Sequence, residues 1–133
     1  MKCLQIDRRR SVTLLAAALA GLGLGTPWLA LAEGYPAKPI QLIVPFPPGG
    51  AVDIVGRTIS KKLGDRLGQP IVIENKAGAG TVVGAAFVAN APADGYTLLI
   101  SSGSTFTVNP ALNAKLPYDP VKSYEPIGMV ARV

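Results

Sequence analysis

The sequence predicts an α/β fold with a mainly parallel sheet, and three observations support this. Short apolar runs rich in β-branched residues recur along the chain. A helical stretch, either amphipathic or made of small apolar residues, separates each run from the next. The links between them are short and rich in glycine and proline. Strands that alternate with helices over short links form right-handed βαβ crossovers, so we expect a parallel sheet flanked by helices within residues 33–133.

The first strand and helix are expected in residues 40–67. The run 40–44 is almost entirely apolar, which is typical of a strand covered on both faces. From Val52 to Leu67 apolar residues recur at spacings of three and four, which predicts one amphipathic helix. Gly68 ends this helix. Gly64 inside it costs about 1 kcal/mol relative to alanine, so we expect a loose final turn.

The later elements follow the same alternation. We expect a strand over 71–74, a helix from 81 or 82 to about 90, and a strand over 96–101. Asn109 and Pro110 predict the N-cap and first residue of a further helix. Asp119 and Pro120 repeat that pattern for a short turn. The run 127–133 predicts the start of another strand.

Residues 1–32 predict a secretory signal peptide that is cleaved after Ala32. A basic segment ending in three arginines precedes an apolar core over 12–25, and the small-x-small sequence 30–32 follows. The core falls short of the roughly 20 residues that span a bilayer, which argues against a membrane anchor. The run 8–12, Arg-Arg-Arg-Ser-Val, leaves general secretion and twin-arginine export both open. We expect the mature chain, residues 33–133, in the periplasm.

Composition argues against several classes of function. The chain has no histidine, and its one cysteine, Cys3, lies in the predicted signal peptide. The usual zinc ligands and thiol nucleophiles are therefore lacking. The net charge is +5, but after residue 32 nine Lys and Arg stand against seven Asp and Glu. Without a basic cluster there is no electrostatic case for nucleic acid, and we expect no metal and no cofactor.

The segment from Val44 to Asp53 has the features of an anion-binding loop. Its prolines fix the path of the chain, and Gly49 and Gly50 let the backbone approach a ligand closely. The start of the following helix presents N–H groups and the positive end of the helix dipole. These features predict recognition of a small carboxylate or phosphate.

Two further loops, 76–81 and 101–109, also follow strands. Ligands of open α/β sheets bind beyond the carboxyl ends of the strands, so we expect these loops beside the first one. Serine and threonine hydroxyls can donate hydrogen bonds to ligand oxygens. The candidate ligand-binding residues are Phe46, Pro48, Gly49, Gly50, Asp53, Gly78, Ala79, Gly80, Ser101, Ser102, Ser104, Thr105 and Asn109. Each loop can also be read as an ordinary tight turn, and for Asp53 a bracing role is favoured over ligand contact.

Two enzyme classes fit the sequence poorly. Residues 78–84 resemble a dinucleotide-binding fingerprint, but the last glycine spacing is one residue too long and Asp94 comes too early. A loop serine such as Ser104 would need a base, yet the chain has no histidine and no G-x-S-x-G elbow. Lys76 is a conceivable but unsupported partner. We therefore expect binding without catalysis, with an exported serine hydrolase as the less favoured alternative.

Taken together, these residues resemble the Bug family of periplasmic solute-binding receptors, the extracytoplasmic component of tripartite tricarboxylate transporters. The matching landmarks run in uninterrupted order over 35–40, 44–53, 67–70, 74–76, 78–84, 91–98, 109–110 and 116–120. The resemblance implies two α/β lobes of the type II periplasmic-binding-protein kind. It also implies capture of a small organic acid and delivery to membrane permease subunits. A module that senses its ligand without a cognate transporter is the alternative.

The sequence departs from the family pattern in three ways. Thr81 stands where family members often carry another glycine, and Ala51 and Val52 add no hydroxyl to the first loop. A full receptor is more than twice as long, so the resemblance implies an incomplete first lobe. An incomplete sheet leaves an unpaired edge. We therefore expect the isolated fragment to be marginally stable and to bind ligand poorly.

Overall fold

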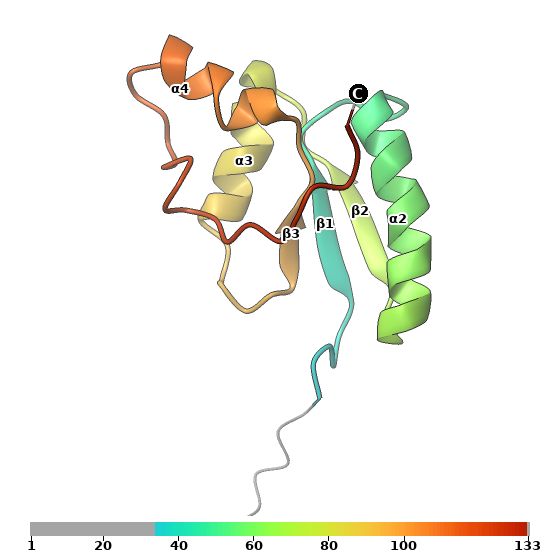
Figure 1. Ribbon diagram of the computed structural model, residues 1–133. Helices are drawn as coiled ribbons and strands as arrows, with labels where there is room; N and C mark the ends of the chain where they lie inside the picture. The colour runs from blue at the N-terminus through green and yellow to red at the C-terminus, as the bar shows by residue number, and fades with distance from the viewer. Residues whose placement is uncertain (1–33, 133) are drawn as a thin grey trace, which may run out of the picture. The chain divides into compact units, whose positions relative to one another are not determined.

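A computed structural model describes residues 34–132 and shows a three-stranded parallel sheet (Figure 1). Its strands are β1 (Ile40–Val44), β2 (Ile71–Asn75) and β3 (Thr97–Leu99). β1 is central, and its Ile43 aligns with Glu74 on one side and with Leu99 on the other. The expected α/β fold with a parallel sheet is confirmed. The predicted signal peptide, residues 1–32, lies outside the described residues.

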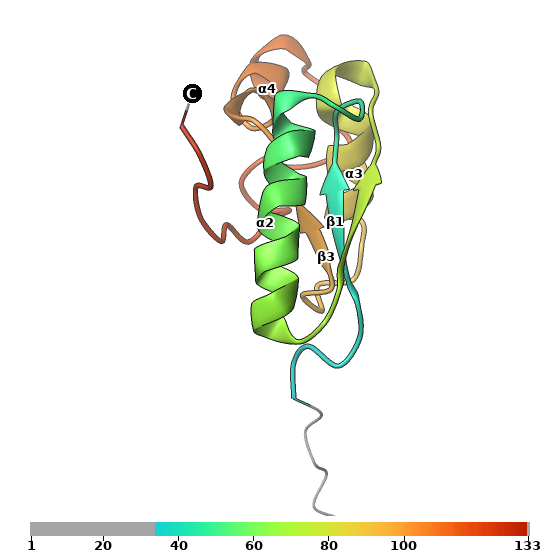
Figure 2. The same cartoon turned by 90° about the vertical axis from the view of Figure 1, so that its right-hand side faces the viewer.

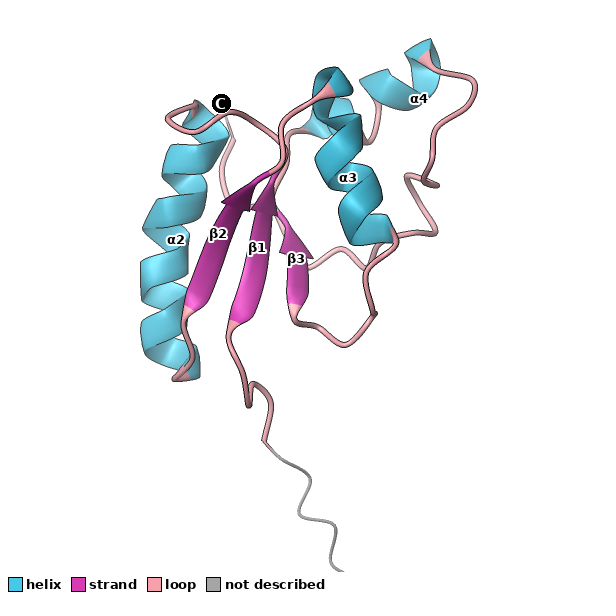
Figure 3. Ribbon diagram, turned by 180° about the vertical axis from the view of Figure 1, so that it is seen from behind, coloured by secondary structure: helices cyan, strands magenta, loops and turns pink. Residues whose placement is uncertain are grey.

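Two helices cover opposite faces of this sheet. α2 (Ala51–Leu67) connects β1 to β2, and α3 (Val82–Ala89) lies between β2 and β3 in the chain. Figures 1 and 3 show the sheet between the two helices, and Figure 2 shows α2 lying along the strands. Because successive strand residues point to opposite faces, alternate side chains of β1 meet different helices. This arrangement explains the continuous apolar run in β1.

The larger part of the core lies between α2 and the sheet. Its buried centre is formed by Leu42, Val44 and Ile100. Partly buried apolar side chains pack around that centre: Phe46, Val52, Val55, Ile59, Ile71, Ile73 and Leu98. Gly56 of α2 faces this core, and a Cβ there would make ordinary van der Waals contact, at 3.6 Å, with side-chain atoms of both Val44 and Ile100.

The predicted bounds of α2 are nearly correct, since it begins one residue early and ends as expected. The chain leaves the helix through Gly68, whose φ of 70° lies in the left-handed region that favours glycine. A Cβ on Gly64 would lie 3.2 Å from the Gln69 carbonyl oxygen, so this glycine lets the chain fold back against the helix. The apolar stripe is less buried at its end than expected, because Leu63 and Leu67 are both 38 % exposed.

Two strand predictions in the later part of the chain need correction. β3 covers three residues rather than 96–101, because after the bond from the Ile100 N–H to the Ile43 carbonyl the chain turns away from β1. The strand predicted over 127–133 is absent from residues 127–132. A strand needs a neighbour for its backbone groups. No described strand pairs with this segment, and Ile127 is 84 % exposed.

The predicted helix cap at Asn109 is also wrong. α4 (Val108–Leu112) has Thr107 as its N-cap residue, so Asn109 and Pro110 both lie inside the first turn. The Asn109 amide is used elsewhere, because its Nδ2 donates to the Gly80 carbonyl at 2.7 Å. Proline is tolerated there because the first N–H groups of a helix have no partner within the helix.

The turn predicted at Asp119 and Pro120 is present. The Asp119 carboxylate accepts hydrogen bonds from the N–H groups of Val121 and Lys122, both at 2.9 Å. Within the part of the chain that the structure describes, no helix is both long enough and apolar enough to cross a membrane.

Candidate functional site

The carboxyl ends of the three strands point to one edge of the sheet, where the connecting loops and the first turns of α2 and α3 lie (Figure 3). Three loops leave this edge: 45–50 after β1, 76–81 after β2, and 100–107 after β3. The candidate residues chosen from the sequence all lie on these loops or in the helical turn that follows. The structure therefore places the three expected loops at one edge.

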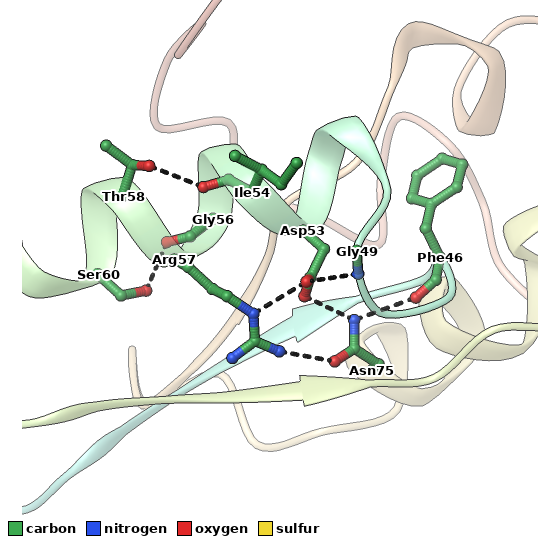
Figure 4. Close-up of polar contacts among 9 residues, drawn as sticks. All are labelled: Phe46, Gly49, Asp53, Ile54, Gly56, Arg57, Thr58, Ser60 and Asn75. Atoms are coloured by element: carbon green, nitrogen blue, oxygen red, sulfur yellow. Dashed lines mark hydrogen bonds and ion pairs between the residues drawn. The ribbon is translucent and has the colours of Figure 1, made fainter.

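The first loop is held by the carboxylate of Asp53, which is buried although it lies in the first turn of α2 (Figure 4). Its Oδ2 accepts hydrogen bonds from the Gly49 N–H and from Arg57 Nε, each at 2.9 Å. Its Oδ1 accepts one from Asn75 Nδ2, also at 2.9 Å. We call Gly49, Asp53, Arg57 and Asn75 the carboxylate brace.

The brace stabilises the charged form of Asp53. The hydrogen bond from Arg57, followed by those from the Gly49 N–H and from Asn75, holds the pKa of the Asp53 carboxyl well below its usual range. The same interactions raise the pKa of the Arg57 guanidinium. Asp53 therefore carries its charge at every physiological pH. A carboxylate whose oxygens face three donors of its own chain is suited to bracing a loop rather than to contacting an anion.

The brace also fixes which groups of the first loop remain available. The Gly49 N–H is taken by Asp53, so this amide does not face a ligand. The Phe46 carbonyl accepts a hydrogen bond from Asn75 Nδ2 at 3.1 Å. Gly50, the N-cap of α2, makes no side-chain cap. The first backbone N–H groups of any helix lack a partner within it, and those of α2 also lack a side-chain cap. Pro48 is exposed beside them.

The second loop has an unusual backbone. Gly78 and Gly80 have positive φ values of 145° and 62°, which glycine adopts at little cost. Ala79 and Thr81 also have positive φ values, 45° and 82°. For a β-branched residue such as Thr81 this conformation is strained, and it persists where the surroundings hold it. A glycine at this position would avoid the strain.

Thr81 is held by a set of buried polar contacts with the third loop. Its Oγ1 lies 2.7 Å from Thr105 Oγ1, which in turn lies 2.6 Å from Ser101 Oγ. Asn109 Nδ2 donates to Thr81 Oγ1 at 3.1 Å and to the Gly80 carbonyl at 2.7 Å. We call Ser101, Thr105, Thr81 and Asn109 the hydroxyl chain. It joins the second and third loops without a charged group.

Thr105 is the fixed centre of the hydroxyl chain. Its side chain is fully buried, and its carbonyl accepts a hydrogen bond from the buried Tyr118 hydroxyl at 2.8 Å. Ser102 and Ser104 lie outside the chain and pair with each other, their Oγ atoms 2.6 Å apart. The hydroxyl candidates of the third loop therefore divide into a set that contacts the buried Thr105 and a separate pair.

Gly84 brings the first and second loops together. A Cβ on this residue of α3 would lie 2.7 Å from Pro45 Cβ and 2.8 Å from the Lys76 carbonyl oxygen. The Lys76 ammonium pairs with Glu74 and lies 4.1 Å from the centre of the Phe87 ring. Lys76 is thus occupied on the α3 side of the sheet rather than beside a loop serine.

Sequence reasoning missed Arg57, Asn75 and the special role of Thr81. The spacing of four between Asp53 and Arg57 places the two on one side of a helix, so an ion pair could have been expected. The contact with Asn75 depends on the pairing of β1 with β2, which local sequence does not reveal. The left-handed conformation of Thr81 had no local signal beyond the neighbouring glycines.

Two grooves among the described residues lie mainly on the two faces of the sheet, and only Lys76 of the three loops lines one of them. One, of about 760 Å³, runs between the second half of α2 and β2; the other, of about 730 Å³, lies between α3 and the sheet. Neither is lined by a candidate residue from the sequence.

A parallel sheet with such loops at one edge is the architecture of a periplasmic-binding-protein lobe, and solved structures confirm this class. The binding protein BugD matches with a TM-score of 0.68 and 40 % identity, over 71 % of this chain and 31 % of BugD. MatC from Rhodopseudomonas palustris, solved with bound malate, matches with a TM-score of 0.64 and 42 % identity. That match covers 67 % of this chain and 30 % of MatC. Another R. palustris protein, solved with adipate, has a TM-score of 0.62 at 36 % identity, over 65 % of this chain and 29 % of its own.

The family follows from sequence comparison. The model of the tripartite tricarboxylate transporter family receptor matches residues 55–133, more than half of the chain, and the chain belongs to this family. BugT of Bordetella pertussis is 43 % identical over 129 residues, which cover 96 % of this chain and 39 % of BugT. A UPF0065 protein of Pseudomonas sp. strain P51 is 37 % identical over 126 residues, 95 % of this chain and 36 % of its own. The resemblance to the Bug family is confirmed, and the chain spans less than two fifths of these relatives.

Proposed function

We propose that this protein is an extracytoplasmic receptor of a tripartite tricarboxylate-type transporter and that its described residues form one wall of a cleft for a small organic acid. The proposal includes export to the periplasm and delivery of the acid to membrane permease subunits. Closure of a second lobe over the ligand would give the loaded receptor a shape that the permease distinguishes from the empty one. Malate and adipate, the ligands in two related structures, support a small carboxylic acid as the substrate class.

The observation that carries this proposal is the convergence of anion-compatible groups at one edge of the sheet. Unpartnered N–H groups at the start of α2 face the same edge as the hydroxyls of the third loop. Carboxylates bind readily to helix N-termini and hydroxyl donors. The carboxylate of Asp53 faces donors of its own chain and so does not repel such a ligand.

The hydrolase alternative gains no support from the loop serines. Ser101 Oγ contacts Thr105 Oγ1, and Ser102 Oγ contacts Ser104 Oγ, so each faces another hydroxyl rather than a base. The Lys76 ammonium is engaged by Glu74 and Phe87. A serine-directed phosphonate reagent should therefore label neither Ser101 nor Ser104. Labelling that depends on either residue would favour the hydrolase.

The function is tested by ligand binding to the longest polypeptide that the reading frame containing these residues encodes. Thermal shift and isothermal titration with malate, adipate, citrate and neutral analogues should show stabilisation by at least one acid and none by its amide. Failure of every acid to bind would contradict the proposal. Co-purification with the permease subunits in the presence of ligand separates a transport receptor from a sensing module without a transporter.

A further inference from the structure

Hydrogen-bond direction within the hydroxyl chain singles out one residue among the candidates. Asn109 Nδ2 lies 2.7 Å from the Gly80 carbonyl oxygen, which can only accept, so this side-chain atom must be the nitrogen. The same nitrogen lies 3.1 Å from Thr81 Oγ1, and it carries two hydrogens, one for each contact. Thr81 Oγ1 is therefore an acceptor from Asn109.

This assignment also fixes the donor and the acceptor of the next hydrogen bonds in the hydroxyl chain. A hydroxyl carries one hydrogen, and that of Thr81 is directed away from the Asn109 donor toward Thr105 Oγ1 at 2.7 Å. Thr105 accepts this bond and donates its own hydrogen to Ser101 Oγ at 2.6 Å. In the opposite direction Thr81 Oγ1 would accept from both Asn109 and Thr105, and its own hydrogen would have no acceptor among these contacts. In the buried surroundings of Thr81 and Thr105, a donor without an acceptor is costly.

The last hydroxyl of the chain has a hydrogen to spare. Ser101 accepts from Thr105, and the hydrogen bonds among residues 34–132 leave its O–H without an acceptor. Ser101 is partly exposed, whereas Thr81 and Thr105 are buried. It follows β3 at the carboxyl edge, where the start of α2 also lies. Hydrogen bonds in a chain polarise one another, so the three upstream donors strengthen the Ser101 donor.

We propose, building on the proposed function, that the Ser101 hydroxyl donates a hydrogen bond to a carboxylate oxygen of the ligand, and that Asn109, Thr81 and Thr105 are positioning residues that set the direction of its proton. Ser101 is the specificity residue, because its hydrogen is left to donate and therefore favours an anionic acceptor on the ligand. The strained conformation of Thr81 then has a role, since it places a hydroxyl where a glycine would leave the direction undefined.

The first test compares binding by variants of the same polypeptide, with malate and adipate as probes. Ser101→Ala should weaken binding of the preferred acid roughly tenfold or more, because a hydrogen bond to a charged group is lost. Ser101→Thr, which keeps the hydroxyl, should restore most of the affinity. Thr81→Val should weaken binding about threefold, whereas Thr81→Ser should not, since the cooperative effect is smaller than the direct bond. Ser60→Ala in α2, far from the loops, is the matched control and should bind as the parent does.

The second test needs no ligand. Hydroxyl protons of Thr81 and Thr105 should exchange slowly with water and be visible by NMR, while that of Ser101 should exchange rapidly. A protected Ser101 proton bonded to Thr105 would overturn the direction argued above. Unchanged acid affinity of Ser101→Ala beside a parent that binds would overturn the role of Ser101 alone. A parent that binds no acid would instead overturn the proposed function and the ligand contact with it.

Discussion

The two supports at the carboxyl edge of the sheet hold its loops in place with different chemistry. The carboxylate brace holds the first loop through a charge, and it uses the Gly49 N–H in doing so. The hydroxyl chain holds the second and third loops with neutral groups and leaves one donor at its end. The charged brace is strong, but the groups that it contacts can no longer bind a ligand. The neutral hydroxyl chain is weaker, but each of its hydrogen bonds sets the direction of the next one. The two supports should therefore respond differently to pH and to substitution.

The largest effect is expected where α3 packs against the first and second loops. Gly84→Ala places a Cβ within 2.8 Å of Pro45 and of the Lys76 carbonyl, so α3 must move away from both loops. Overpacking against backbone of this kind should lower the free energy of unfolding by about 3 kcal/mol. Urea unfolding measures it. Gly103→Ala is the control, because nothing lies within 4 Å of a Cβ there, and equal stability of the two variants would contradict the contact.

The charge of the carboxylate brace is tested by Asp53→Asn. The amide keeps the shape of the side chain, but its NH2 must face either the Gly49 N–H and Arg57 Nε or Asn75 Nδ2, and all of these are themselves donors. We expect the melting temperature to fall on the order of 5–10 °C. The same change at the exposed Asp65, whose contact with Lys61 is 4.0 Å, should leave it unchanged. An unchanged melting temperature for Asp53→Asn would contradict a stabilising role for the Asp53 charge.

The stabilising contributions of the two supports should also differ in their dependence on acid pH. The pKa of Asp53 lies well below its usual range in the folded protein, so the unfolded chain binds more protons once the pH falls below about 4. The contribution of the brace is complete above that pH and is lost as the pH falls toward the folded pKa. Asp94 and Asp119, with lowered pKa values from backbone N–H donors, act in the same direction. Urea unfolding between pH 6 and pH 2 should show a shallower acid dependence for Asp53→Asn than for the parent.

The hydroxyl chain should be weaker and independent of pH. Thr105→Val keeps the volume of the side chain but leaves the Thr81 hydroxyl and Ser101 without their shared partner. A loss of about 1–2 kcal/mol in the free energy of unfolding is expected, since one buried partner is left unsatisfied. The loss should be the same at pH 4 and pH 7. Thr58→Val in α2, where the hydroxyl bonds its own helix, is the control and should change stability by less.

The smallest expected effect has the opposite sign. Ala79 has a φ of 45° and is exposed, so Ala79→Gly removes strain without removing a buried contact. We expect a gain of about 0.5 kcal/mol in the free energy of unfolding, which chemical denaturation at high precision can measure. A loss instead would mean that the flexibility of the unfolded glycine chain outweighs the strain in the second loop.

Local patterns were sufficient for the elements whose contacts are local. The apolar run 40–44 is β1 to the residue, and the glycine at 68 ends α2 as expected. The predictions were wrong where the extent of an element depends on a partner distant in sequence. β3 is shorter than its apolar run because its pairing with β1 ends. The segment 127–132 forms no strand because none of the described strands pairs with it.

The candidate site shows the same division. The position of the three loops at one edge follows from the order of strands and helices, which sequence predicts. The partners of Asp53 and Asn109 do not, because Asn75 and Gly80 approach them only through the packing of neighbouring loops. Asparagine is a common helix cap, but the Asn109 side-chain amide instead donates to the Gly80 carbonyl in the second loop. The role of each ligand candidate in binding stays a prediction.

The carboxylate brace lies beneath the tip of the first loop, and this separation matters for engineering. Asp53, Arg57 and Asn75 carry the support, while Pro47 and Pro48 at the tip are exposed. A library confined to these two prolines can therefore vary the entrance to the proposed cleft while the carboxylate brace stays intact. For the proposed receptor, variants with altered ligand preference should be recovered from such a library more often than from one that includes position 53.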